Sequence, residues 1–366
     1  MKKLLKAIPL MLVVLMLTAI VSACGNSGSK VDVGIVLPTK DEPRWVQDEQ
    51  RFKDELKGTK YSVEILFSQG SSAKEKENVD SLIAKGIKVL IISPQDGDAA
   101  AASVEAAQKA GIKVISYDRL ITNTDAVDYY VTFDSVAVGK AQAQYLVDNA
   151  KGSGQPLYLY AGAASDNNAF LFFEGAWTVL QPKIADGTFK IANSSEAVTL
   201  QDKAELSREE LSKIISQVTT NWDPSEAKNK AQTHLTAAAA DQKGDVAILA
   251  PNDGTARSIA DVFATDSAIT SFVVTGQDAE KASIQYVIDG KQSMTVFKDV
   301  RNLVKDAMGM AVTILDGKEP ETTGSYNNGK VDVQAKQTDV IVVDKDNVKA
   351  SLIDSKYYEA SEFTGL

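Results

Sequence analysis

Ten side chains of this 366-residue chain have the chemistry to bind a polar ligand, and most of them follow a short apolar stretch directly. They are charged groups and amides together with two tryptophans: Arg44, Trp45, Asp118, Arg119, Asp166, Asn168, Trp222, Asn252, Asp278 and Lys298. Carboxylates and amides accept hydrogen bonds from hydroxyl groups, Arg and Lys donate them, and aromatic faces cover apolar C–H surface. A small polyhydroxylated molecule such as a monosaccharide needs that mixture.

Most of these candidates also have a structural interpretation that the sequence leaves open. Asp253 and Asp278 precede predicted helices, where an Asp side chain commonly caps the first turn. Trp222 directly precedes a capping-box pattern at 223–226, so its ring could pack against that helix alone. The remaining alternatives are a cap among Asp166, Asn167 and Asn168, surface residues at Arg44 and Trp45, an internal Asp118–Arg119 ion pair, and a solvated Lys298.

Two of Asp118, Asp166 and Asp278 could instead serve a glycosidase. Such an enzyme needs two carboxyl groups about 5 to 9.5 Å apart, flanking the scissile bond. Here Arg, Asn and Lys accompany the carboxylates, which favours ionised acceptors over a protonated acid. We therefore expect a binding protein that needs no cofactor, rather than an enzyme.

Metal and nucleophilic chemistry lack the residues that they need. His234 is the only histidine and Cys24 the only cysteine, whereas a zinc site draws on several such ligands. His234 also lies within a predicted helix, where nothing indicates a Ser-His-Asp arrangement. We expect no metal site and a structural role for this histidine.

The elements that must position the ten candidates alternate between strand and helix. Short runs rich in Val and Ile, separated by helical patterns, indicate parallel sheets covered on both faces. The predicted fold class is therefore α/β, with two successive doubly wound units, and ligands bind such sheets at the carboxyl ends of the strands. The expected strands are 31–37, 61–67, 89–92, 113–116, 127–133, 157–161, 189–192, 246–250, 272–275 and 294–297.

Three stretches need separate treatment. The polar excursion 196–221 interrupts the second unit, and its residues 205–211 have the pattern of an amphipathic helix. The C-terminal stretch from Gly329 contains strand-like runs that need a sheet to join. On the helix expected at 168–180, aromatic residues spaced three and four apart predict a core stripe rather than a ligand platform: Phe170, Phe173 and Trp177.

The N-terminus indicates export and lipid anchoring. Lysines precede an apolar run that ends in Val21-Ser22-Ala23-Cys24, so residues 1–23 are predicted to be a signal peptide. Cys24 fits the acylated first residue of a mature lipoprotein, and 24–30 fits a flexible tether rich in Gly and Ser. The alternative is an ordinary secretion signal with an incidental cysteine. We expect the mature protein at the outer face of the cell membrane.

The charge balance excludes one class of partner. The formal net charge is −10. Cleavage of the signal peptide would remove three lysines and no acidic residue, which leaves a net charge of about −13. Phosphate contacts require clustered Lys and Arg. We expect no binding to nucleic acid.

Six short motifs carry a resemblance to a known family. They are Arg44-Trp45, 116–120 (SYDRL), 129–134, 166–169 (DNNA), 275–279 (TGQDA) and 297–299 (FKD). With them the chain resembles the sugar-binding components of ABC importers that have the type I periplasmic-binding-protein fold, among them xylose-binding and multiple-sugar-binding proteins. The resemblance runs from Val31 nearly to the C-terminus. The excursion 196–221 is longer than the family pattern.

The resemblance implies two lobes joined by three crossings, near 133–135, 276 and 325. It divides the chain into an N-terminal lobe (31–134 plus 277–324) and a C-terminal lobe (135–276 plus 325–366). It implies that the ten candidates contact a pyranose, expected to be D-xylose or another aldopentose or aldohexose. Lobe closure would capture the sugar for the permease of an ABC importer. The alternative partner is the outer domain of a membrane histidine kinase.

Overall fold

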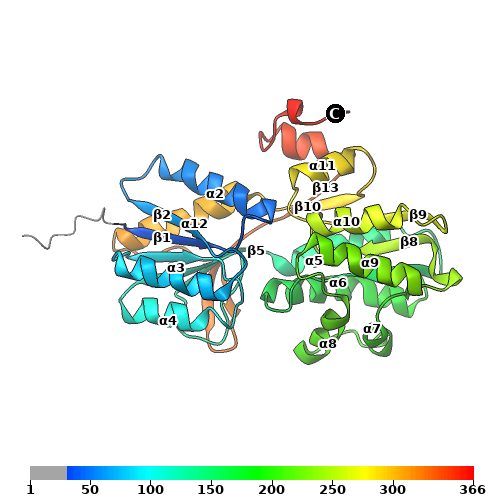
Figure 1. Ribbon diagram of the computed structural model, residues 1–366, viewed down its shortest axis with the longest axis horizontal. Helices are drawn as coiled ribbons and strands as arrows, with labels where there is room; N and C mark the ends of the chain where they lie inside the picture. The colour runs from blue at the N-terminus through cyan, green and yellow to red at the C-terminus, as the bar shows by residue number, and fades with distance from the viewer. Residues whose placement is uncertain (1–30) are drawn as a thin grey trace, which may run out of the picture.

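Two parallel sheets, each with helices on both faces, divide the chain into two lobes (Figure 1). The computed structural model describes residues 31–366. The predicted signal peptide, Cys24 and the tether lie outside these residues. No helix within 31–366 has the length and hydropathy to cross a membrane. The doubly wound α/β prediction is confirmed.

The first lobe contains a seven-stranded sheet in the order β11-β12-β5-β4-β3-β1-β2. All neighbouring strands are parallel except β11 and β12. Strand β1 is buried along its whole length, as expected for a strand covered on both faces. The strands are β1 (Val33–Leu37), β2 (Val63–Phe67), β3 (Val89–Ile92), β4 (Lys113–Tyr117), β5 (Tyr129–Phe133), β11 (Gly324–Asn327) and β12 (Asp332–Thr338).

Helices cover this sheet in two pairs. Helices α3 (Ser72–Ala84) and α4 (Ala101–Lys109) pack on one face, and α2 (Pro43–Leu56) and α12 (Val300–Leu315) on the other. Helix α3 begins where Ser71 caps its first turn, since the Ser71 side chain accepts from the Lys74 amide.

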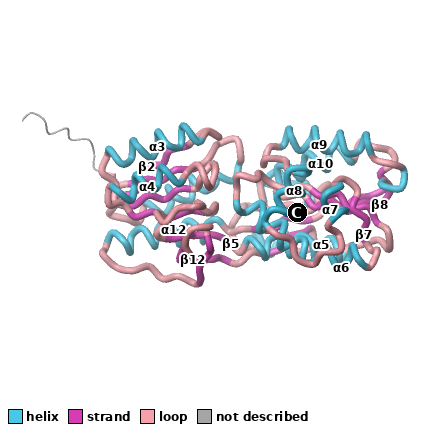
Figure 2. Tube along the Cα trace, turned by 90° about the horizontal axis from the view of Figure 1, so that it is seen from below, coloured by secondary structure: helices cyan, strands magenta, loops and turns pink. Residues whose placement is uncertain are grey.

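The second lobe contains a four-stranded parallel sheet in the order β7-β6-β8-β9. Figure 2 shows this sheet between α9 and α10 on one side and α5 and α6 on the other. Its strands are β6 (Gln155–Leu159), β7 (Phe189–Ile191), β8 (Gly244–Leu249) and β9 (Ile269–Val274), and the helices are α5 (Ser135–Asp148), α6 (Asn167–Ala185), α9 (Pro224–Ala237) and α10 (Asp253–Phe263).

A smaller core adjoins the second sheet. Strand β10 (Met294–Phe297) pairs antiparallel with β13 (Ile341–Asp344), and α11 (Lys281–Ile288) packs beside them with the C-terminal segment. That segment touches the first lobe: the Tyr357 hydroxyl donates to the Gln47 side chain, and Gln47 donates to the Tyr358 hydroxyl. The short helical turns of the second lobe are 240–242, 349–353 and 360–362.

The structure corrects two of the predicted lobe boundaries. Residues 277–297 were expected in the N-terminal lobe, but Gln277 pairs with Val296 and this stretch shares a core with β13. Residues 325–338 were expected in the C-terminal lobe, but β12 pairs with β5. The chain therefore crosses near 134, 298–299 and 339–340. The sequence shows which runs are strands, whereas the partner of each strand depends on non-local packing.

The excursion also differs from its prediction. Its main helix is α8 (Arg208–Val218), not 205–211, because Ser207 and Glu210 form a capping box that starts the helix three residues later. A short helix, α7 (Ser195–Thr199), precedes it. The apolar residues of α8 are buried in the core that also holds Phe173 and Trp177, so the predicted core stripe on α6 is correct.

Candidate ligand-binding pocket

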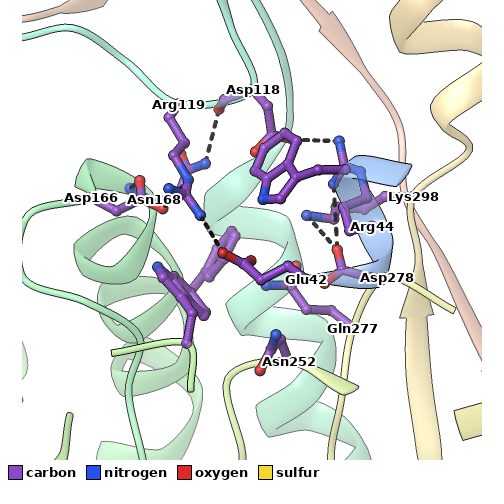
Figure 3. A pocket seen from close by; sticks show the side chains of 13 residues that line it. Glu42, Arg44, Asp118, Arg119, Asp166, Asn168, Asn252, Gln277, Asp278 and Lys298 are labelled. Atoms are coloured by element: carbon purple, nitrogen blue, oxygen red, sulfur yellow. Dashed lines mark hydrogen bonds and ion pairs between the residues drawn. The ribbon is translucent and has the colours of Figure 1, made fainter. Parts of the chain in front are cut away.

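All ten predicted residues line one pocket between the lobes. Figure 3 shows charged side chains that converge on it from both lobes. Three further residues line it that the sequence reasoning missed: Glu42, Phe172 and Gln277. The lining thus contains four carboxylates, three cations, three amides and three aromatic rings.

The first turn of α2 supplies Arg44 and Trp45. Pro43 opens this helix, and the Arg44 guanidinium is then held by Asp48 one turn later, with Nε donating to Oδ2 at 2.6 Å. The same guanidinium donates to Asp118 at 2.8 Å and to Asp278 at 3.4 Å. Burial opposes its charge, but the three carboxylates raise the pKa of Arg44 well above its usual value. The Arg44–Trp45 pair is buried rather than an exposed helix start.

Asp118 and Arg119 follow β4, where a turn separates their directions. Asp118 has a φ of +62°, in the left-handed region, and this bend lets two adjacent side chains both reach the pocket. Arg119 Nε lies 3.1 Å from Asp166, which belongs to the other lobe. Burial opposes the charge of Asp118, but Arg44 and Lys298 outweigh it and lower the pKa of Asp118 to about 2. Each residue thus pairs with a group from another element.

The N-terminus of α6 supplies Asp166, Asn168 and Phe172. Asp166 is the cap, since it accepts from the Asn168 amide at 2.9 Å. Burial raises the pKa of Asp166 although Arg119 opposes that shift. The Asn168 side chain donates to the Asp118 carbonyl at 2.9 Å and so links the lobes again. Phe172, one turn after Asn168, shares its helix face; that spacing could have revealed it.

The proposed caps at Asp253 and Asp278 are wrong, whereas Asn252, like Asp166, both caps a helix and lines the pocket. Asn252, not Asp253, caps α10, accepting from the Thr255 amide. Asp253 is buried instead beneath the pocket residues, where Gln292 donates to it at 2.7 Å. Asp278 does not cap α11, whose cap residue is Glu280.

Lys298 lies at the second crossing between the lobes, just after β10. It is 4% exposed, so the solvated alternative is wrong. Its ammonium lies 2.8 Å from Asp278 and about equally far from two rings, at 5.6 Å from Phe133 and 5.7 Å from Phe172. A cation beside the hinge thus holds the carboxylate that also pairs with Arg44.

Gln277 directly precedes Asp278 and Glu42 lies two residues before Arg44, and this proximity in the sequence was the available indication for both. Burial raises the pKa of Glu42, although Arg119 opposes that shift. Gln277 Oε1 and the indole N–H of Trp222 are buried, and neither has a hydrogen-bond partner within residues 31–366. Buried polar atoms are nearly always paired, so a polar molecule fits the space that they face.

The arrangement can bind and orient a small polar molecule between two lobes. No group of three or more His, Cys, Asp or Glu side chains among the described residues is arranged to hold a metal. The carboxylates that line the pocket are paired with cations, and such ionised groups are suited to accept hydrogen bonds from hydroxyl groups.

Comparisons with known proteins give the context of this pocket. Residues 33–319 match the family described as periplasmic binding protein domain. The multiple sugar-binding periplasmic receptor ChvE of Rhizobium radiobacter is 34% identical over 92% of this chain and 93% of the relative. The D-xylose-binding periplasmic protein of Escherichia coli is 29% identical over 91% and 92%.

A solved structure is much more similar. The carbohydrate transporter solute-binding protein of Chloroflexus aurantiacus, in complex with D-glucose, is 71% identical with a TM-score of 0.91, covering 92% of this chain and 99% of the other. A solute-binding protein of Clostridium phytofermentans with bound β-D-glucose is 32% identical with a TM-score of 0.79, covering 90% and 99%.

Proposed function

Because the chain belongs to the periplasmic binding protein family, as a sugar-binding component of ABC transporters and not an enzyme, we propose that the pocket between its lobes is the sugar site. The thirteen lining residues would contact the ligand, the ten predicted ones among them. The observation that carries the proposal is the orphaned donor on Trp222 together with the orphaned acceptor on Gln277. A hydroxyl group can satisfy either atom.

Closure of the lobes would capture the sugar. Arg119 and Asp166 come from opposite lobes, as do Asn168 and Asp118, so the pocket is complete only when the lobes are together. A ligand that contacts both sides stabilises this arrangement over an open one through its additional contacts. The three crossings near 134, 298 and 339 are where the chain would bend.

The ligand that we propose is a neutral aldohexose or aldopentose, with D-glucose ahead of D-xylose. The two glucose-bound structures support D-glucose, and the xylose-binding relatives support D-xylose, which the sequence alone favoured. The lining has one more carboxylate than cations. That balance disfavours sugar acids.

A thermal-shift panel of pentoses, hexoses and their acids on the mature protein tests this assignment. A ligand at a hundred times its Kd should add about 2.7 kcal/mol to stability. D-Glucose or D-xylose should raise the unfolding temperature, with glucuronate as the matched charged control. No shift with any neutral aldose would overturn the proposal.

Delivery to the permease of an ABC importer is the proposed physiological role, with Cys24 as the lipid anchor at the outer face of the cell membrane. A sensing role is the second candidate, because ChvE carries the name of a receptor. Pull-down on permease and histidine-kinase outer domains, with and without sugar, separates the two.

Cys24→Ser should release a processed, sugar-binding protein from membranes; retention of the variant on membranes would exclude Cys24 as the anchor.

A further inference from the structure

The excursion 196–221 is followed directly by the pocket residue Trp222, and this position in the chain suggests a role for the segment. The indole of Trp222 is 8% exposed and lies edge-to-face with Phe172, with ring centroids 6.2 Å apart. Asn221 and Trp222 both have left-handed backbone, with φ of +50° and +62°. Two consecutive residues in this region are unusual for side chains other than glycine, and a tryptophan there is strained.

Hydrogen bonds tie the end of α8 to the end of β6 and hold that backbone in place. Val218 accepts from the Ala161 amide at 3.1 Å, and Ala161 accepts from the Thr220 amide at 2.8 Å. The Thr219 hydroxyl donates to the Gly162 carbonyl at 2.7 Å. The segment that leaves α8 is thereby paired alongside residues 161 and 162.

Gly162 leaves the space that the indole occupies. A Cβ on this residue would lie 2.0 Å from Cζ2 of Trp222 and 2.1 Å from Cη2. No side-chain contact is that short, so an alanine would force the ring to move. Phe172 and the ligand pocket both adjoin the ring, so a displaced ring would change the pocket wall.

We propose that Gly162 and Asn221 are positioning residues for Trp222, and that α8 serves to hold this ring as a wall of the ligand pocket. The inference rests on the proposed function. Gly162 supplies the space and Asn221 supplies the backbone turn, while α8, anchored in the core of the second lobe, keeps both in register. Neither residue lines the pocket itself.

A double-mutant cycle with calorimetric titration of D-glucose tests the proposal. Gly162→Ala should weaken binding about tenfold, the order expected when an aromatic contact is lost. Trp222→Ala should weaken it similarly, and the double variant should be no worse than Trp222→Ala. A full additional loss in the double variant, or unchanged affinity in Gly162→Ala, would overturn the proposal. Gly309→Ala is the matched control, because a Cβ there meets nothing within 4 Å.

Asn221 gives an independent test if Gly162→Ala fails to fold. Asn221→Gly and Asn221→Val both remove the side chain's bond to Glu226, but only glycine adopts a positive φ without strain. The glycine variant should bind D-glucose more tightly than the valine variant by about tenfold; equal affinities would refute the role. The wild-type titration tests the proposed function separately: if the wild-type protein binds no monosaccharide, the proposed function fails. If it binds and the variants behave like it, only the positioning role fails.

Discussion

Trp45 and Trp222 line the pocket from opposite lobes, each close to a proline that opens a helix, yet they are held in different ways. Trp45 lies inside α2, is 2% exposed, and belongs to the core of the first lobe. Two guanidinium groups flank its ring, at 5.2 Å for Arg44 and 5.0 Å for Arg119. Trp222 precedes its helix and depends on strained backbone and the space at Gly162.

The difference teaches that one wall of the pocket belongs to the main core of a lobe, whereas the other belongs to a small buried cluster with Phe172 and Val296. A change at Trp45 should therefore affect folding and binding together, whereas a change at Trp222 should affect binding with a smaller cost in stability. Buried charged groups surround Trp45, so the stability of the first lobe should also respond to pH.

Trp45→Ala is expected to have the largest effect. Truncation of a buried tryptophan leaves a cavity and typically lowers the free energy of unfolding by about 3–5 kcal/mol. Urea unfolding followed by circular dichroism measures it. A loss of less than about 1 kcal/mol would mean that Trp45 is as peripheral as Trp222, and the comparison would fail.

Glu75, buried in the first lobe, tests the role of charge. Burial raises its pKa to about 7, although it accepts from the Gln95 amide. Because the folded-state pKa exceeds the ordinary value, this group's stabilisation is complete below about pH 4.5 and is lost as the pH rises through about 7. The decline should amount to about 3 kcal/mol.

Unfolding by urea at intervals between about pH 4 and 8 measures that decline. Glu75→Gln keeps an acceptor for the amide and removes the titration, so its stability should lack this decline. The second lobe should respond with the opposite sign through His234, whose pKa burial lowers to about 4: its contribution falls as the pH drops from about 6.5 to 4. Equal pH profiles for wild type and Glu75→Gln would contradict the assignment.

Asp118→Asn should weaken sugar binding by about 1–3 kcal/mol, because it replaces an acceptor with a donor and leaves Arg44 less well paired. Arg119→Ala should have a similar effect through Asp166. Titration calorimetry with the best sugar of the panel measures both. Asp80→Asn is the matched control, since its pair with Lys76 is exposed. Near-wild-type affinity in both variants would remove this pair from the site.

Trp222→Ala should have the smallest effect on the free energy scale, about 1 kcal/mol or more in binding. Its unfolding temperature should fall less than that of Trp45→Ala, because the ring packs in a small cluster rather than in the main core of a lobe. A large fall in unfolding temperature with unchanged affinity would show that the ring only staples α9.

Local patterns predicted much of this molecule, and non-local pairing limited the rest. Strands β3 and β10 have their expected bounds, since short apolar runs define them locally. Eight of the ten candidates gather because the carboxyl ends of parallel strands meet at one edge, whereas Trp222 follows α8 and Lys298 follows the antiparallel strand β10. The positive φ of Asp118 and of Trp222 could not be predicted, because nothing in those residue types requires it.

The position of β12 has a consequence for how the chain folds. Ala335 of β12 lies opposite Tyr130 of β5, so β5 stays unpaired on this side until β12 is synthesised about two hundred residues later. Contacts so distant in sequence are slow to form, and an unpaired strand edge invites aggregation meanwhile. The second lobe likewise completes β10 only when β13 arrives. The last strands of the chain therefore complete the first lobe's sheet and the β10–β13 pair, and a chain that stops before residue 332 would leave β5 as an open edge.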